Sequence, residues 1–140
     1  MWVASDREGH VGGFVTAGVG PVPDEALREE FVPVVDVEEI LHRLPKISTT
    51  RLLSAVKRPD DFVDLTERGV FVFDWTDIHR SSAEAVKAYE AVAVPHHPIG
   101  VAELPGELVI VATALKFTEL TFADRRQLQV CRYLKCSNWK

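Results

Sequence analysis

The stretch VFVFDW at residues 70–75 constrains the fold more than any other part of the chain. Phe71, Phe73 and Trp75 alternate with smaller or polar side chains, so an extended backbone places the three aromatic rings on one face. Alternating aromatic and β-branched residues are typical of a strand inside a sheet. Because such a strand must bury its aromatic face against a second layer, the chain is expected to fold around a sheet.

Two segments near the N-terminus also predict regular structure. Apolar runs at 2–5 and 11–17 flank the stretch REGH, whose Gly9 suits a turn, and together they predict a hairpin. The prolines of GVGPVP then interrupt both helix and strand. Asp24 follows them as the expected cap of a brief helix over 24–30.

The next segments carry helix signals. Asp36 stands three residues before Glu39, as in a capping box, and predicts a helix that Pro45 ends. Thr49 or Thr50 can cap a further helix, because both side chains suit that position and apolar residues follow.

Two more helices are indicated by proline at the start and by their apolar spacing. The first follows Pro59 and is expected to end at Gly69, a residue suited to the C-terminal cap. The second follows Pro105, and its apolar residues recur at intervals of four, three and four.

The remaining segments predict strands at 88–95, 119–122 and 128–134. A capping box near 81 leaves helix and strand both open for 82–90, and a helical turn at 82–86 before the strand is the favoured interpretation. Strands and helices therefore occur in mixed order, with no regular βαβ alternation. This order predicts a single α+β domain over 1–140, with a mainly antiparallel sheet and helices packed on one face.

The charge of the chain is concentrated in one acidic segment. The formal net charge is −5, and 24–39 contains seven carboxylates against one base, Arg28. This balance argues against a nucleic-acid binder, which normally presents a broad basic surface. Helix-start acids and solvated glutamates are one interpretation of the segment, and a surface that recognises a basic protein is the other. The predicted partner-binding residues are Asp24, Glu25, Glu29, Glu30, Phe31, Glu38 and Glu39.

A second candidate site is the stretch FDWTDIHR at 73–80, together with PHHP at 95–98. A carboxylate and an imidazole can share a cation, or the carboxylate can orient the imidazole for general-base chemistry. The spacing matches no metalloenzyme signature, and a strand that leaves a core turns polar in the same way. We therefore expect no catalytic activity, cofactor or metal, and keep a metal-assisted or general-base enzyme as the alternative. Its residues would be Asp74, Asp77, His79, His96 and His97.

The cysteines and the apolar runs indicate a cytoplasmic protein. The start of the chain lacks the pattern of a signal peptide, and the longest apolar run, LVIVATAL, is too short to span a bilayer. Cys131 and Cys136 match no redox or zinc motif and are expected to be reduced thiols. On one regular strand their odd spacing would direct them to opposite faces.

Two stretches carry a resemblance to known proteins. WVASDREGHVGGFVTAGVGPVP and YEAVAVPHHPIGVAELPGELVIVA, about a third of the chain, resemble small uncharacterised bacterial proteins. Some of these are similar to the immunity proteins of polymorphic toxin systems. The resemblance implies a cytoplasmic α+β protein that binds and neutralises a toxin domain without catalysing a reaction. It carries no functional motif, so it assigns no residue roles.

Overall fold

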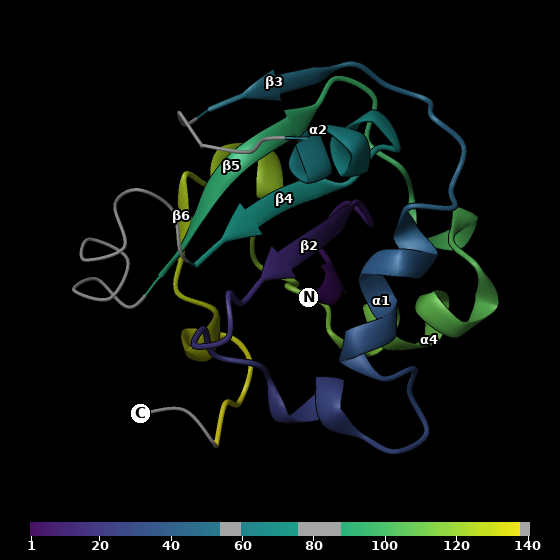
Figure 1. The fold of residues 1–140 in the computed structure, drawn as a ribbon. Helices are drawn as coiled ribbons and strands as arrows, with labels where there is room; N and C mark the ends of the chain where they lie inside the picture. The colour runs from purple at the N-terminus through teal and green to yellow at the C-terminus, as the bar shows by residue number, and fades with distance from the viewer. Residues whose placement is uncertain (54–59, 76–87, 138–140) are drawn as a thin grey trace.

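The computed structural model describes residues 1–53, 60–75 and 88–137, and it has a six-stranded mixed sheet at its centre (Figure 1). The strand order is β1-β2-β4-β5-β3, and the short β6 also pairs with β5. β2 and β4 run parallel, and the other pairs in the described residues are antiparallel. The strands are β1 Trp2–Ser5, β2 Val11–Val15, β3 Thr50–Leu52, β4 Phe71–Asp74, β5 Tyr89–Pro95 and β6 Gln127–Leu128.

The helices pack against this sheet, which confirms the α+β class. α1 and α4 both contact β1, whereas α2 contacts β3, β4 and β5. In Figure 1, α2 lies in front of the sheet and the yellow C-terminal segment passes behind β5. The α-helices are α1 Val34–Leu41, α2 Asp60–Glu67 and α4 Gly106–Ala114. Short 3-10 helices are η1 Asp24–Leu27, η2 Val101–Glu103, η3 Phe122–Asp124 and η4 Val130–Arg132.

One face of the sheet is a continuous layer of aromatic rings. The register places Trp2 beside Phe14 and Phe14 beside Phe73, across three neighbouring strands. Their rings stack, with centroids 4.1 Å apart for Trp2 and Phe14 and 5.0 Å apart for Phe14 and Phe73. The predicted central strand is thus confirmed, and Phe71 and Phe73 are both buried in the core.

The segment after α4 covers this aromatic face. The Phe122 ring meets the rings of Phe14 and Phe73 at centroid distances of 5.9 and 5.6 Å. The approach is close enough that a Cβ on Gly12 would lie 2.8 Å from a Phe122 ring carbon. The strand expected at 119–122 is therefore wrong, because here the chain turns into η3 and inserts Phe122 into the core.

The Asp6 carboxylate fixes the position of this covering segment. Asp6 is fully buried, and its Oδ1 accepts hydrogen bonds of 3.0 Å from the backbone N–H groups of both Glu8 and His10. Its Oδ2 accepts the backbone N–H of Phe122 at 2.9 Å. Since three N–H groups compensate the desolvated charge, one side chain joins the β1–β2 turn to the chain end that covers the sheet.

The opposite face of the sheet receives helices. The Ser5 side chain lies on the face of the sheet opposite to Trp2, and its hydroxyl donates a hydrogen bond of 2.7 Å to the carbonyl of Ala112 in α4. The chain leaving α4 then continues beside β1, with Ser5 N–H donating to Leu115 O at 3.0 Å. α4 is therefore fixed to β1 by both side-chain and backbone hydrogen bonds.

The end of α2 agrees with the sequence-based expectation. Gly69 has a φ of +94°, in the left-handed region that glycine adopts readily. A Cβ at this position would also lie 2.6 Å from the backbone nitrogen of Ile99. Gly69 therefore both ends the helix and allows the loop before η2 to approach.

Four other expectations are wrong. η1 begins at Asp24 itself, after Pro23, and ends at Leu27, so Asp24 is not its cap and the helix does not extend to 30. α1 begins at Val34 after Pro33, whose fixed φ suits a helix start, so Asp36 lies inside the first turn and is not the cap. Thr50 begins no helix, because it pairs with Pro95 in β3. Of 128–134, only Leu128 belongs to a strand, and η4 follows. The expected turn at 82–86 lies outside the described residues.

In the part of the chain that the structure describes, no helix combines the length and apolarity needed to cross a membrane.

Replacing Asp6 should destabilise the fold severely. In Asp6→Asn an NH₂ group replaces one of the two carboxylate oxygens, so at least one backbone N–H loses its acceptor and faces another donor. We therefore expect the unfolding free energy to fall by about 2–4 kcal/mol. Urea denaturation followed by tryptophan fluorescence measures this loss. The matched control is Glu8→Gln, at an exposed carboxylate in the same turn, which should change stability by less than about 0.5 kcal/mol. Equal stability of both variants would contradict the anchoring role of Asp6.

Candidate functional site

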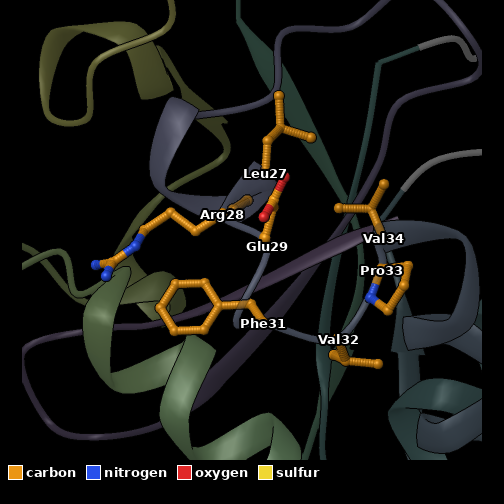
Figure 2. Close-up of a pocket in the computed structure, with 8 residues that line it drawn as sticks. Leu27, Arg28, Glu29, Phe31, Val32, Pro33 and Val34 are labelled. Carbon is orange, nitrogen blue, oxygen red and sulfur yellow. The ribbon is translucent and has the colours of Figure 1, made fainter.

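A surface hollow lies between η1 and the start of α1. It is a cavity of about 270 Å³, open to solvent, and Figure 2 shows the side chains around it. We call it the η1–α1 pocket. Its lining residues are Ala26, Leu27, Arg28, Glu29, Phe31, Val32, Pro33 and Val34.

The local sequence explains why the chain forms a hollow here. Arg28 leaves η1 in an extended conformation, and the N–H of Phe31 donates to Arg28 O at 3.1 Å. Pro33 then sets the start of α1. Because the six residues between the two short elements carry no ladder or α-helical hydrogen bonds among themselves, they arch around the space.

Phe31 holds this arch onto the protein. Its side chain belongs to the core, with 8% of its surface exposed, and the Arg28 guanidinium lies 5.2 Å from its ring centroid. In Figure 2 the Phe31 ring and the Arg28 side chain extend to the same side, away from Val34. Phe31 was predicted to contact a partner, and the structure places it chiefly as an anchor of the loop.

The exposed apolar groups of this surface are different residues. Leu27, which lines the pocket, is 49% exposed, and Val35, next to the lining residue Val34, is 82% exposed. Neither residue was predicted from the sequence. No local signal marked them, because each follows another apolar residue, Ala26 or Val34, and only the packing decides which of the two turns inward.

Arg28 neutralises part of the acidic segment. Its Nη1 lies 2.6 Å from Glu25 Oε1, and its Nε lies 2.8 Å from Glu30 Oε1. The hydrogen bond from Arg28 lowers the pKa of Glu30 below its usual value. Glu25 and Glu30 therefore offer a partner less unpaired charge than the sequence suggests.

Asp24 serves a structural purpose at the other end of η1. Its carboxylate accepts the backbone N–H of Ser137 at 2.8 Å and the hydroxyl of Ser137 at 2.5 Å. Its own N–H donates to Lys135 O at 2.8 Å. The bonds from Ser137 lower the pKa of Asp24, so this carboxylate fastens the C-terminal segment to η1.

The remaining acids divide into paired and unpaired groups. Glu39 lies 2.9 Å from Arg43, and Glu38 lies 3.4 Å from His42, both along α1. Glu29 and Asp36 are exposed, and neither side chain makes a hydrogen bond or ion pair within the described ranges. The negative charge open to a partner is therefore centred on Glu29 at the pocket and Asp36 on the first turn of α1.

The alternative site is not brought together by the described residues. Asp74 is buried at the end of β4 and pairs with Glu90 at the start of β5. His96 follows the opposite end of β5, six residues further on, so an extended strand separates it from Asp74 by roughly 20 Å. Asp77 and His79 lie outside the described residues.

His96 and His97, the histidines of this alternative that the structure describes, both contact the segment before β3. His96 Nδ1 lies 2.6 Å from Thr49 Oγ1, and the backbone N–H of His97 donates to Ser48 Oγ at 2.8 Å. Across residues 1–53, 60–75 and 88–137, no three His, Cys, Asp or Glu side chains are arranged to hold a metal ion.

A charged network beside the acidic segment joins α1 to α2. Arg68 donates Nε and Nη2 to the two carboxylate oxygens of Asp64 at 3.0 and 3.1 Å, and His42 of the α1 end contacts the same carboxylate. Arg68 also reaches the carbonyl of Leu44. The guanidinium of Arg68, followed by His42, lowers the pKa of Asp64 to about 2. Glu38 extends the network through His42.

This network should give the protein an acid-sensitive stability. The Asp64 pKa is depressed from its ordinary 3.8, so its contribution is complete above that value and is lost as the pH falls toward 2. Asp64→Asn should lower the unfolding free energy at neutral pH by about 1–2 kcal/mol, a value discounted for partial exposure. Urea unfolding at several pH values should show a shallower acid limb for this variant. Glu119→Gln, in an exposed turn, is the control, and an unchanged acid limb in Asp64→Asn would contradict the assignment.

Comparison of the chain with protein-family models, curated proteins and solved structures found no match.

Proposed function

We propose that this protein is a small cytoplasmic binding module that recognises a basic protein through the η1–α1 pocket and the acids beside it. One observation carries the proposal: exposed Leu27 and the unpaired carboxylate of Glu29 line an open cavity. Exposed Val35 and Asp36 follow its last lining residue, Val34, on the first turn of α1. Exposed apolar groups within a polar rim are the usual composition of a protein interface.

The charge supports a basic partner. The whole chain carries −5, and the carboxylates open at this surface would attract a cationic patch during encounter. The apolar pocket would supply the affinity, because burial of aliphatic side chains is not screened by salt. The Leu27 side chain would then pack into a hollow on the partner, and the η1–α1 pocket would accept an aliphatic side chain of the partner.

An immunity-type inhibitor is the specific form of this proposal. The resemblance of the hairpin and the strand–loop–helix segment to immunity-like bacterial proteins points to a toxin domain as the partner. The alternative, a metal-assisted or general-base enzyme, receives no support from a described residue, because Asp74 lies beside the start of β5 and His96 follows its other end.

Removing the exposed apolar groups should weaken partner binding without affecting the fold. The partner is first captured from cells of the source organism with the wild-type protein and then purified. Leu27→Ser combined with Val35→Ser should raise the dissociation constant at least about tenfold in calorimetry, because interface anchors contribute more than about 1 kcal/mol each. Thermal stability should hold, since both side chains are exposed.

The matched control is Leu52→Ser, at an exposed leucine on the edge strand β3. It should bind the partner as the wild type does. Equal affinity of the double variant and this control would place the interface elsewhere.

Reversing the unpaired charges should slow association. Glu29→Lys with Asp36→Lys should reduce the association rate constant by about tenfold or more at low ionic strength, with a much smaller effect at 0.5 M salt, where the Debye length is roughly 4 Å. Surface plasmon resonance at two salt concentrations measures this difference. The control reverses Glu8 and Glu119, two exposed acids near the β1–β2 turn. An identical slowing in this control would mean that net charge, and not the pocket, steers the partner.

A further inference from the structure

We propose that the η1–α1 pocket binds a lysine or arginine side chain, whose aliphatic stem packs against the wall of the pocket while its cationic end meets the Glu29 carboxylate. This inference rests on the proposed function, because it identifies the group of the partner that enters the pocket. The apolar wall and the charged groups that line the pocket together select this occupant.

The wall of the pocket is mainly aliphatic. Leu27 contributes from the end of η1, and Val32, Pro33 and Val34 contribute from the approach to α1. The cavity of about 270 Å³ has the volume of roughly nine water molecules in the liquid. One long, unbranched side chain therefore fits inside it and can lie along the apolar wall.

Two charged residues line the pocket, Arg28 and Glu29, and the charge of Arg28 is already paired. The Arg28 guanidinium contacts the carboxylates of Glu25 and Glu30 at 2.6 and 2.8 Å. It also lies 5.2 Å from the centroid of the Phe31 ring, and Figure 2 shows both side chains extending to the same side. Among the described lining residues, an anionic ligand would thus find no unpaired cation. A quaternary ammonium would find the aromatic ring already occupied by Arg28.

Glu29 is the charged lining residue that can still receive a ligand. It is exposed, and its side chain makes no hydrogen bond or ion pair within the part of the chain that the structure describes. In Figure 2 its carboxylate extends in the same direction as the Leu27 side chain. A ligand that packs its stem on Leu27 can therefore bring a cationic end to Glu29.

A lysine or arginine side chain satisfies the wall and the carboxylate together. Such side chains bury their methylene stems on apolar surface while the charged end keeps contact with water. A neutral aliphatic side chain would cover the same wall, but it would displace water from Glu29 without replacing the lost hydrogen bonds. An acidic side chain would be repelled by the same carboxylate.

The test uses capped amino acids as probes, so it needs no partner. Amide signals of the ¹⁵N-labelled protein are followed by NMR during titration with N-acetyl-lysine methylamide and with the matching arginine, norleucine and glutamate compounds, at constant pH and ionic strength. We expect the cationic probes to cause saturable shifts at residues 26–34, with a dissociation constant of millimolar order. The norleucine probe has the stem without the charge. It should bind about three- to fivefold more weakly, which is the range of an exposed ion pair.

The two cationic probes show which side chain the pocket prefers. Equal affinity for the norleucine and the cationic probes would overturn the inference. So would shifts centred outside residues 26–34, or the absence of shifts with every probe.

Matched variants show whether Glu29 makes the selection. Glu29→Gln keeps the size of the side chain and removes its charge, so it should reduce the affinity for the cationic probes to that for norleucine. Asp36→Asn removes another unpaired charge, at a residue that does not line the pocket, and should leave these affinities unchanged. An equal loss in both variants would mean that net charge attracts the probes, and would overturn the role of Glu29.

Failure of this inference is distinguishable from failure of the proposed function. If Leu27→Ser with Val35→Ser loses the captured partner while no cationic probe shifts the pocket, the inference fails and the function stands. If the lysine or arginine probe binds beside Glu29 while the partner tolerates the double variant, the function fails and the preference of the pocket stands.

Discussion

The buried carboxylate of Asp6 is the interaction on which the rest of this structure depends. It accepts N–H groups from the β1–β2 turn and, 116 residues further along the chain, from Phe122. A carboxylate buried away from solvent is stable only when hydrogen-bond donors surround it, so Asp6 needs the N–H groups of the turn and of Phe122 together. The hydrogen bond from the Phe122 N–H to Asp6 holds the Phe122 ring over the aromatic face of the sheet, where it contacts Phe14 and Phe73.

The covering of that face determines where the helices lie. Because a C-terminal segment that contains only short 3-10 helices fills the aromatic side, α1 and α4 pack beside β1, with α4 fixed through Ser5 on the other side. A second buried chain of hydrogen bonds joins the same layers: Trp2 donates to the Tyr89 hydroxyl at 3.2 Å, and Tyr89 donates to Pro21 O at 2.7 Å. Pro21 precedes η1, so the core also positions the segment that forms the pocket.

The candidate surface illustrates how folding redistributes charge. Seven acids stand close together in the sequence, but Asp24 binds the C-terminal segment, and Arg28 pairs with Glu25 and Glu30. What stays open is a smaller set, Glu29 and Asp36, beside apolar groups. A surface of this kind combines long-range attraction with a short-range apolar contact, which suits recognition of a partner protein.

The sequence by itself determined the elements whose signals are local. Alternation marked β4, and Gly69 marked the end of α2, because a pleated face and a left-handed residue depend on near neighbours. Only the tertiary structure decided the rest. Thr50 lies in a strand because it pairs with Pro95 of β5. The expected strand at 119–122 is instead a turn, which is held by a hydrogen bond to Asp6 near the N-terminus. The exposed pair beside the pocket was likewise invisible in the sequence, since exposure depends on what other segments leave uncovered.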